Sequence, residues 1–117
     1  MAEPDVRTFL PLTPAVFHIL LALADEDRHG YGIAREVGER TDGDVQLGPG
    51  TLYGTLVRML DAKLIEERVR PARRSESENR RRYYRLTRLG RDVAEAEARR
   101  LNSLVAIARR KSLIPSR

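Results

Sequence analysis

The chain has no cysteine and no tryptophan, and aromatic residues make up only 5% of its 117 positions. Without cysteine it can form neither a disulfide framework nor a thiolate metal site, and a reducing compartment fits this composition. Its two histidines, His18 and His29, stand in no HExxH spacing, and no glycine-rich phosphate loop followed by Lys-Ser or Lys-Thr occurs. Paired carboxylates or a nucleophile beside a base are not apparent either. We therefore expect no enzyme activity, no metal and no cofactor.

Long hydrophobic runs are missing as well. The longest unbroken apolar run covers residues 19–24, whereas a helix needs about 20 apolar residues to span a bilayer. The first ten residues, MAEPDVRTFL, lack the charged-then-apolar order of a secretory signal. These absences predict a soluble, cytoplasmic protein that does not enter a membrane.

The composition allows one small domain. Hydrophobic residues make up 41% of the chain and charged residues 33%, so the core is expected to be aliphatic and modest in size. We expect a partner chain to complete part of it.

Positive charge is concentrated in one stretch. Residues 68–85 hold eight arginines and two glutamates, a net charge of +6, while the whole chain carries +5. Such a density of guanidinium groups is typical of a surface that binds nucleic-acid phosphates. A solvated loop that only aids solubility is the alternative explanation.

Hydrophobic spacing and turn residues predict a helix-rich fold. Thr13 and Pro14 have the residue types of an N-cap and a first helical residue, and the apolar run behind them predicts a central, buried helix. The further elements that we expect are a helix over residues 31–41, a minimal strand at 45–47, a helix from 51 to about 64, strands at 65–70 and 80–86 joined by 71–79, and a helix from 87 to about 112. This is the order of a winged helix-turn-helix, a mostly α fold with a small β-hairpin, followed by a long C-terminal dimerisation helix.

The chain accordingly divides into three parts. We expect an N-terminal arm over residues 1–11, a winged helix-turn-helix domain over 12–86 and the C-terminal helix over 87–117. The arm is either flexible or an added helix of a dimer, and the residues favour neither alternative.

The last predicted helix has a broadly apolar side. Its members are Leu89, Val93, Ala96, Leu101, Leu104, Val105 and Ala108. A small core cannot cover a rod roughly 39 Å long, so we expect this stripe to pack on the same stripe of a second chain in a two-fold homodimer. Arg100 and Lys111 interrupt the heptad, which favours a mixed helical interface over a free coiled coil.

Five short stretches in a fixed order point to a family. They are Leu12-Thr13-Pro14, His29-Gly30-Tyr31-Gly32-Ile33, Gly50-Thr51-Leu52-Tyr53, Leu64-Ile65, and Tyr83-Tyr84-Arg85-Leu86-Thr87 followed by Gly90. With them the chain resembles the PadR family of bacterial transcriptional regulators. The resemblance implies a dimeric repressor that binds palindromic operators, often at its own promoter, and that releases them when a small molecule or stress signal arrives. It also implies that the last helix forms the dimer together with the first helix of the partner.

One position departs from the family pattern. Lys63 stands where the family usually has a glycine before Leu-Ile. Because a left-handed backbone is unfavourable for lysine, we expect either a slightly longer third helix or a turn of another type.

The third predicted helix has a polar face opposite its apolar one, and we assign this face to DNA. Thr51 could hold a phosphate at the helix start or serve only as an N-cap. Tyr53 flanks the face and is expected to reach the DNA backbone, as the resemblance also implies, with a core position as the alternative. Gly54 leaves a smooth spot, and Arg58 could grip a phosphate or read a guanine. Asp61 indicates that the lower part of the helix lies away from phosphates.

The wing supplies the remaining candidates for phosphate or minor-groove contacts, because a guanidinium matches phosphate geometry. They are Arg73, Arg74, Arg80, Arg81 and Arg82. Strand alternation predicts Tyr84 in the core and Tyr83 near DNA. We expect His29 to be structural, with an effector or pH role as the alternative, and His18 to be a satisfied core or interface histidine.

These observations favour a dimeric, DNA-binding transcriptional regulator. Its expected partners are double-stranded DNA with a palindromic operator, a second copy of the chain and a small-molecule effector, and repression by occupying a promoter is the expected mode. The alternative is a winged-helix interaction adaptor, whose long helix recruits another protein while the wing binds nucleic acid only loosely.

Overall fold

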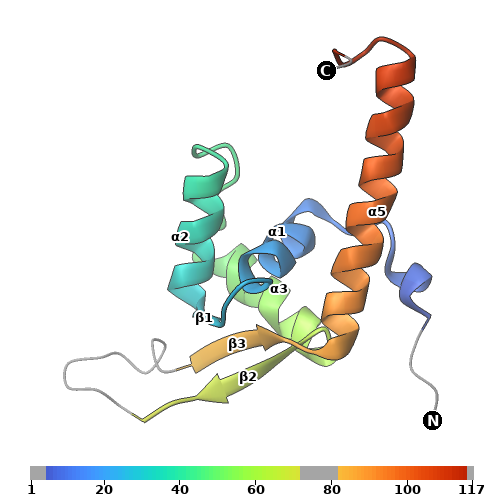
Figure 1. Ribbon diagram of the computed structural model, residues 1–117. Helices are drawn as coiled ribbons and strands as arrows, with labels where there is room; N and C mark the ends of the chain where they lie inside the picture. Colours follow the sequence, from blue (N-terminus) through green and yellow to red (C-terminus); the bar gives the residue numbers. More distant parts are fainter. Residues whose placement is uncertain (1–4, 72–81, 116–117) are drawn as a thin grey trace.

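The structure, a computed structural model, describes residues 5–71 and 82–115. Its elements in chain order are the 3-10 helix η1 (Val6–Phe9), α1 (Pro14–Leu23), β1 (Arg28–His29), α2 (Gly30–Arg40), α3 (Pro49–Asp61), β2 (Ile65–Val69), β3 (Arg82–Leu86) and α5 (Arg88–Arg110). Helices α1, α2 and α3 pack with the small sheet into one body, and α5 projects from it as a rod (Figure 1). The predicted mostly α fold with a β-hairpin and a long last helix is confirmed.

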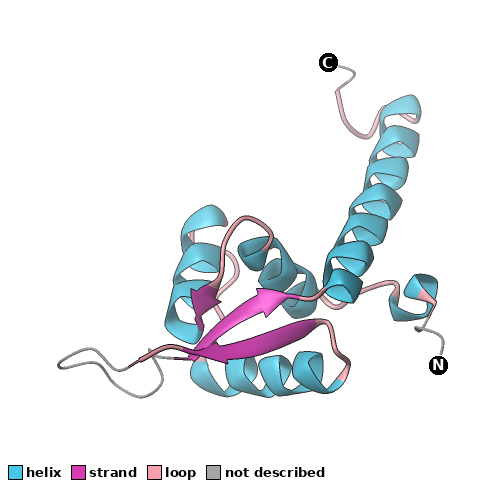
Figure 2. Ribbon diagram, turned by 60° about the horizontal axis from the view of Figure 1, so that its bottom comes forward, coloured by secondary structure: helices cyan, strands magenta, loops and turns pink. Residues whose placement is uncertain are grey.

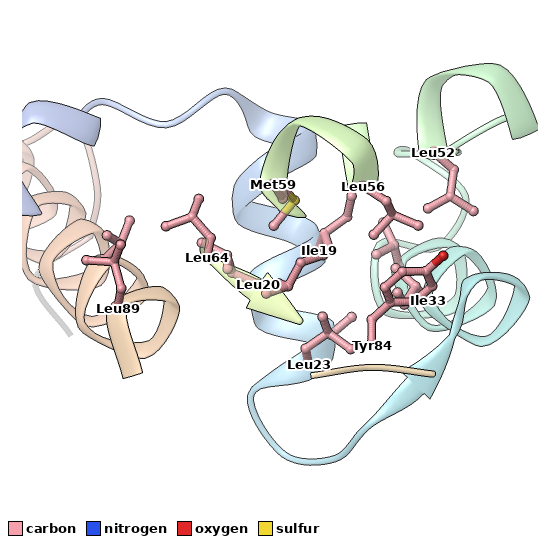
Figure 3. Close-up of a cluster of buried hydrophobic side chains, with 14 residues drawn as sticks. Ile19, Leu20, Leu23, Ile33, Leu52, Leu56, Met59, Leu64, Tyr84 and Leu89 are labelled. Carbon is pink, nitrogen blue, oxygen red and sulfur yellow. The ribbon is translucent and has the colours of Figure 1, made fainter. Parts of the chain in front are cut away.

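Helix α1 starts where its sequence predicts. The Thr13 hydroxyl accepts a hydrogen bond from the Val16 amide (3.3 Å), and Pro14 occupies the first helical position. Ile19 is fully buried and lies in the middle of the core (Figure 3). Leu21 remains 38% exposed, so the helix is central without being buried all round.

The sheet has three antiparallel strands in the order β1-β3-β2. In the β2–β3 hairpin, Ile65 pairs with Leu86 at the base, and both strands lie within the predicted ranges. The expected strand at residues 45–47 is wrong, because that segment is irregular and the third strand is Arg28–His29, which pairs with β3. Two residues are too few for an alternating pattern, and their partner lies far away in the sequence, so nothing local indicates this strand.

Helix α3 begins earlier than predicted. Gly48 is its N-cap and Pro49 its first residue, so Thr51 is the third residue of the helix and the N-cap alternative for Thr51 is wrong. Proline fits the first helical position because it has no N–H that needs a partner. The helix ends at Asp61, three residues before the predicted end.

The turn after α3 is a Schellman motif with Lys63 in the left-handed conformation (φ 66°). The Leu64 amide donates to the Met59 carbonyl and the Lys63 amide to the Leu60 carbonyl, both at 3.0 Å. Both alternatives expected from the missing glycine are therefore wrong. The motif brings Leu64 into the core (Figure 3), and this burial offsets a left-handed backbone that costs a lysine about 1–2 kcal/mol.

Thr87 caps α5 and ties its start to the end of α3. The Thr87 hydroxyl donates to the Lys63 carbonyl (2.6 Å) and accepts from the Gly90 amide (3.0 Å), while the Thr87 amide donates to the Leu64 carbonyl (3.1 Å). Gly90 lies so close to this turn that a Cβ would stand 1.9 Å from the Leu64 carbonyl oxygen. A glycine is required here by the close approach of two backbones.

The N-terminal segment is folded where the structure describes it. Helix η1 contacts α5 (Figure 2). Its Val6 and Phe9 side chains pack against the core. Farther on, the Leu12 amide donates to the Glu97 carboxylate of α5 (2.9 Å). We call residues 5–12 the N-terminal strap, and it holds the body and α5 together from outside.

Within the described ranges, no helix combines the length and the apolar character that a membrane span requires.

Candidate nucleic-acid interface

Helix α3 turns a polar face away from the core. Its buried residues are Leu52, Thr55, Leu56 and Met59. Thr51, Arg58 and Asp61 are exposed and Gly54 is partly exposed, so the outward face is the one that the sequence predicts. Thr55 is the exception, because this polar residue lies on the inner side of the helix.

Arg58 folds back along α3 toward the helix start. Its Nη2 donates to the Thr55 hydroxyl (3.2 Å), and the Thr55 hydroxyl donates to the Thr51 carbonyl (2.7 Å). Among the described residues no carboxylate pairs with Arg58. Its positive charge therefore remains available to a ligand.

Tyr53 is partly buried at the margin of the core. A Cβ at Gly30, the first residue of α2, would lie 2.6 Å from the Tyr53 hydroxyl oxygen, so this glycine leaves the room that the ring needs. The ring is thus anchored on α2 and still has an exposed part. The core contact and a contact with DNA are compatible in this position.

The described part of the wing mixes arginine with glutamate and tyrosine. Arg82 is exposed, with its Nη1 3.5 Å from a Glu67 carboxylate oxygen. Tyr83 meets the His29 ring edge-on at a centroid distance of 5.5 Å, and the Arg70 guanidinium lies 5.1 Å from the Tyr83 ring centroid. The other predicted wing contacts, Arg73, Arg74, Arg80 and Arg81, lie outside the described residues.

Tyr84 is buried, as strand alternation predicts (Figure 3). Burial raises the pKa of the Tyr84 phenol to about 12, and the nearby Glu67 charge acts in the same direction. Because successive side chains of a strand point to opposite faces, the buried position of Tyr84 places Tyr83 on the face of β3 that points away from the core.

Both histidines have structural partners. His29 is the N-cap of α2, where its Nδ1 accepts a hydrogen bond from the Gly32 amide (2.9 Å), so the structural interpretation is confirmed. His18 lies with its Nδ1 3.0 Å from Arg40 Nη2, and its pKa is lowered by burial and then by the Arg40 charge. In the parts of the chain that the structure describes, no three His, Cys, Asp or Glu side chains gather into a metal site.

The residues proposed for dimerisation fall into two groups. Leu89 and Val93 are buried in the core of their own chain. For these two residues the prediction that a partner chain covers them is therefore wrong. The others, none of them buried, are Ala96, Leu101, Leu104, Val105 and Ala108. Leu104 is 49% exposed, and Ile107, which is not one of the predicted interface residues, is 39% exposed.

An ion pair near the middle of α5 was not predicted from the sequence. Glu97 is only 2% exposed, and its two carboxylate oxygens accept from Arg100 Nε (2.5 Å) and Nη2 (3.1 Å). The Arg100 hydrogen bond lowers the pKa of Glu97 against the opposing effect of burial. A signal was present, because Glu97 follows Leu89 and Val93 at the same four-residue spacing and has an arginine three residues later.

The comparison with protein families gives one match over most of the chain. A family model described as "Transcriptional regulator PadR-like family" matches residues 19–96. An uncharacterized 37.1 kDa protein in transposon TN4556 of Streptomyces fradiae is 45% identical over 80 residues, which are 68% of this chain and 21% of that protein. The chain thus spans about a fifth of the length of this curated relative.

Solved structures with the same fold include two regulators. A PadR family transcription regulator from hypervirulent Clostridium difficile R20291 is 30% identical, with a TM-score of 0.70 over 84% of this chain and 97% of that one. Bacillus subtilis PadR in complex with operator DNA is 21% identical, with a TM-score of 0.63 over 74% of this chain and 47% of that one. At 21% identity, the similarity to the Bacillus subtilis protein shows a shared fold and nothing more.

Proposed function

Because this chain belongs to the PadR-like family of transcriptional regulators, we propose that it binds double-stranded operator DNA as a homodimer and represses transcription by occupying a palindromic site. One observation carries the proposal. Helix α3 lies beside the β2–β3 hairpin (Figure 2). Its exposed Arg58 has no acidic partner among the described residues, and the hairpin bears further arginines.

Helix α3 has the features of a helix that enters the major groove. Its N-cap is Gly48, its first turn contains Gly50, and no side chain caps it, so backbone amides are open to a phosphate oxygen. Thr51 and Arg58 follow on the exposed face, at the distance of two helical turns or less. The amides and Thr51 would position the helix on the backbone, and Arg58 would read a base edge.

The wing would hold the DNA backbone next to that groove. Arg68 and Arg82 are exposed on neighbouring strands, and residues 68–85 have a net charge of +6. The pairing of Arg82 with Glu67 is loose at 3.5 Å, so phosphate can compete for this guanidinium. The wing would contribute affinity more than sequence preference.

The homodimer would be formed through the distal half of α5. Exposed Leu104 and Ile107 lie on a rod that projects beyond the body (Figure 1). Two-fold pairing of these rods would present two α3 helices to half-sites about 34 Å apart, one turn of DNA. A palindromic operator follows from this symmetry. Bacillus subtilis PadR, which has the same fold, is in complex with operator DNA, and this supports operator DNA as the partner.

Release by a small molecule is part of the proposal. An apolar hollow of about 320 Å³ lies between α2 and the start of α3, lined by Tyr31, Ala34, Leu47, Pro49, Leu52 and Tyr53. A ligand here would lie against the Tyr53 ring, beside the face assigned to DNA. Binding of such a ligand would therefore oppose binding of the operator.

Titration against genomic fragments, including the DNA upstream of the gene itself, tests the function. We expect one short palindrome to bind at least about 10³-fold more tightly than random duplex at the same salt concentration. Footprinting of that fragment should show two protected half-sites about one helical turn apart.

Two results would contradict the proposal. Uniform, weak binding to all fragments would instead support an interaction adaptor with loose affinity for nucleic acid. Absence of binding to any duplex, even in dilute buffer, would remove DNA as a partner altogether.

A further inference from the structure

We propose that Thr55 is a positioning residue that holds the Arg58 guanidinium in place for reading a guanine. The inference rests on the proposed function, in which α3 enters the major groove. It adds the residue that sets sequence preference from inside the protein, without touching DNA itself.

The arrangement is a short relay of hydrogen bonds along α3. The Thr55 hydroxyl donates its one proton to the Thr51 carbonyl (2.7 Å) and accepts from Arg58 Nη2 (3.2 Å). Because Thr55 is only 1% exposed, water does not compete for this hydroxyl. The direction of the relay is therefore fixed, and Arg58 is its outer end.

Gly54 completes the seat of the guanidinium. If Gly54 had a Cβ, the nearest atom would be Arg58 Nη1, at 3.7 Å. The guanidinium thus lies over the flat spot that the glycine leaves, one turn before its own Cα. A glycine inside a helix costs about 1 kcal/mol relative to alanine, and this seat gives a reason for its presence.

The position leaves one edge of the guanidinium free. The hydrogen bond to Thr55 uses one N–H of Nη2, so a second N–H of Nη2 and both N–H groups of Nη1 remain. Two parallel donors match O6 and N7 of guanine in the major groove. An exposed arginine without such a seat samples many rotamers, and this freedom is lost when it binds. The contacts with Thr55 and Gly54 reduce this loss of conformational entropy. They also favour guanine, because its O6 and N7 fit the two donors of a guanidinium held in one orientation.

The experiment compares four variants with the wild type. They are T55V, which keeps shape and burial and removes the hydroxyl, T55S, which restores the hydroxyl, R58A, and the double variant T55V/R58A. Affinity is measured on the mapped operator and on operators in which each guanine is replaced by adenine. R58A first identifies the guanine whose replacement no longer matters.

We expect T55V to reduce the preference for that guanine about 5- to 10-fold. T55S should retain the preference, and T55V should have no further effect in the R58A background. The slope of affinity against salt should not change with T55V, because no phosphate contact is removed.

A control removes a hydroxyl elsewhere in the same body. The Thr41 hydroxyl, at the C-terminal end of α2 and outside α3, donates to the Val37 carbonyl (2.9 Å) and accepts from the Val45 amide (3.0 Å). T41V is expected to lower stability and to leave base preference as it is. Thermal unfolding of each variant establishes that it is folded, and T55A replaces T55V if the second methyl group of valine disturbs the packing.

Three outcomes would overturn the inference. Full preference in folded T55V, or an equal loss of affinity from T55V with and without Arg58, would mean that Thr55 does not act through Arg58. R58A with an unchanged base preference would remove the role of Arg58 as reader. A wild-type protein that ignored duplex DNA would overturn the proposed function itself, before any variant is compared.

Discussion

The two halves of α5 have different surroundings although they form one continuous helix. In the first half, Leu89, Val93 and Glu97 follow each other at four-residue spacing and are all buried by the chain's own body. In the second half, from residue 98 to 110, no residue is buried, and Leu104 and Ile107 are among its exposed side chains. The same kind of apolar stripe thus closes a core at one end and is left uncovered at the other.

An ion pair between the buried Glu97 and the partly exposed Arg100 marks the boundary between the two halves. Glu97 ends the buried row with a negative charge, which the Arg100 guanidinium neutralises and to which the Leu12 amide of the N-terminal strap donates a hydrogen bond. Beyond this point the helix projects from the body (Figure 1), and the part of the chain that the structure describes buries none of residues 98–110. We therefore expect substitutions in the first half to change folding and those in the second half to change assembly.

Gly90→Ala tests the first half and should have the largest effect. Its Cβ would stand 1.9 Å from the Leu64 carbonyl oxygen, and backbone cannot give way as a flexible side chain does. We expect a loss of about 3 kcal/mol or more in the free energy of unfolding, measured by urea denaturation.

Gly38→Ala is the matched control. Gly38 lies inside α2, and a Cβ there would meet nothing within 4 Å. The substitution should stabilise the protein by about 0.5–1 kcal/mol, because alanine restricts the unfolded chain. If both variants were equally stable, the close approach of Gly90 to the Leu64 carbonyl would not determine how α5 joins the body.

Leu104→Glu tests the second half. A carboxylate on the exposed stripe would have to be buried in the proposed dimer, so we expect the dissociation constant of the dimer to rise about 100-fold. Sedimentation velocity over a range of concentrations measures it, while circular dichroism should show that the helix content is retained. Ala106→Glu, about 160° away around the helix from Leu104, adds the same charge outside the stripe and should have little effect.

A dimer that tolerated Leu104→Glu would contradict the assignment of the interface. The same variant unfolding at concentrations where the wild type is monomeric would contradict the division of α5 into two halves.

The comparison also explains what the sequence could predict. Leu89 and Leu104 are equivalent by periodicity, since both belong to one helical stripe. The stripe therefore predicts the helix and its apolar side. It cannot say that the body covers Leu89, because that depends on the turn at Lys63 and the glycine at position 90, which bring distant backbone together.

The candidate site divides in a similar way. Helical spacing was enough to predict that Thr51 and Arg58 face outward on α3. The buried Thr55 beneath them was not predicted, because a polar residue at a core position is a break in the pattern and its partner is set by side-chain geometry. Strand β1 was missed for a related reason, since two residues have a strand conformation only through their pairing with β3.

Glu97→Gln tests how much the ion pair between Glu97 and Arg100 contributes to stability. The Arg100 hydrogen bond lowers the pKa of Glu97, so the folded protein holds this carboxylate ionised more firmly than the unfolded chain does. The resulting stabilisation is present above the ordinary pKa of 4.5 and is lost as the pH falls through the lowered folded value. At pH 7 we expect glutamine to cost about 1–2 kcal/mol, less than in a fully buried pair because Arg100 is partly exposed.

The measurement is the free energy of unfolding of both proteins between pH 7 and pH 3. The gap between wild type and Glu97→Gln should be widest at neutral pH and should narrow below pH 4.5. A gap that stayed constant with pH would mean that the carboxylate charge contributes nothing and that only the shape of the side chain matters.

The smallest effect comes from two helix ends that share one geometry. Lys63 after α3 and Ser112 after α5 both have positive φ (66° and 65°) and both close a Schellman motif. Lys63→Gly should raise the free energy of unfolding by about 1 kcal/mol, because glycine takes this backbone without strain and the turn is part of the core. Ser112→Gly should change it by less than about 0.3 kcal/mol, since the end of α5 can fray without unfolding the body. Urea denaturation of dilute protein gives both values. Equal gains would mean that the end of α5 melts together with the body, and the helix would then be one cooperative unit along its whole length.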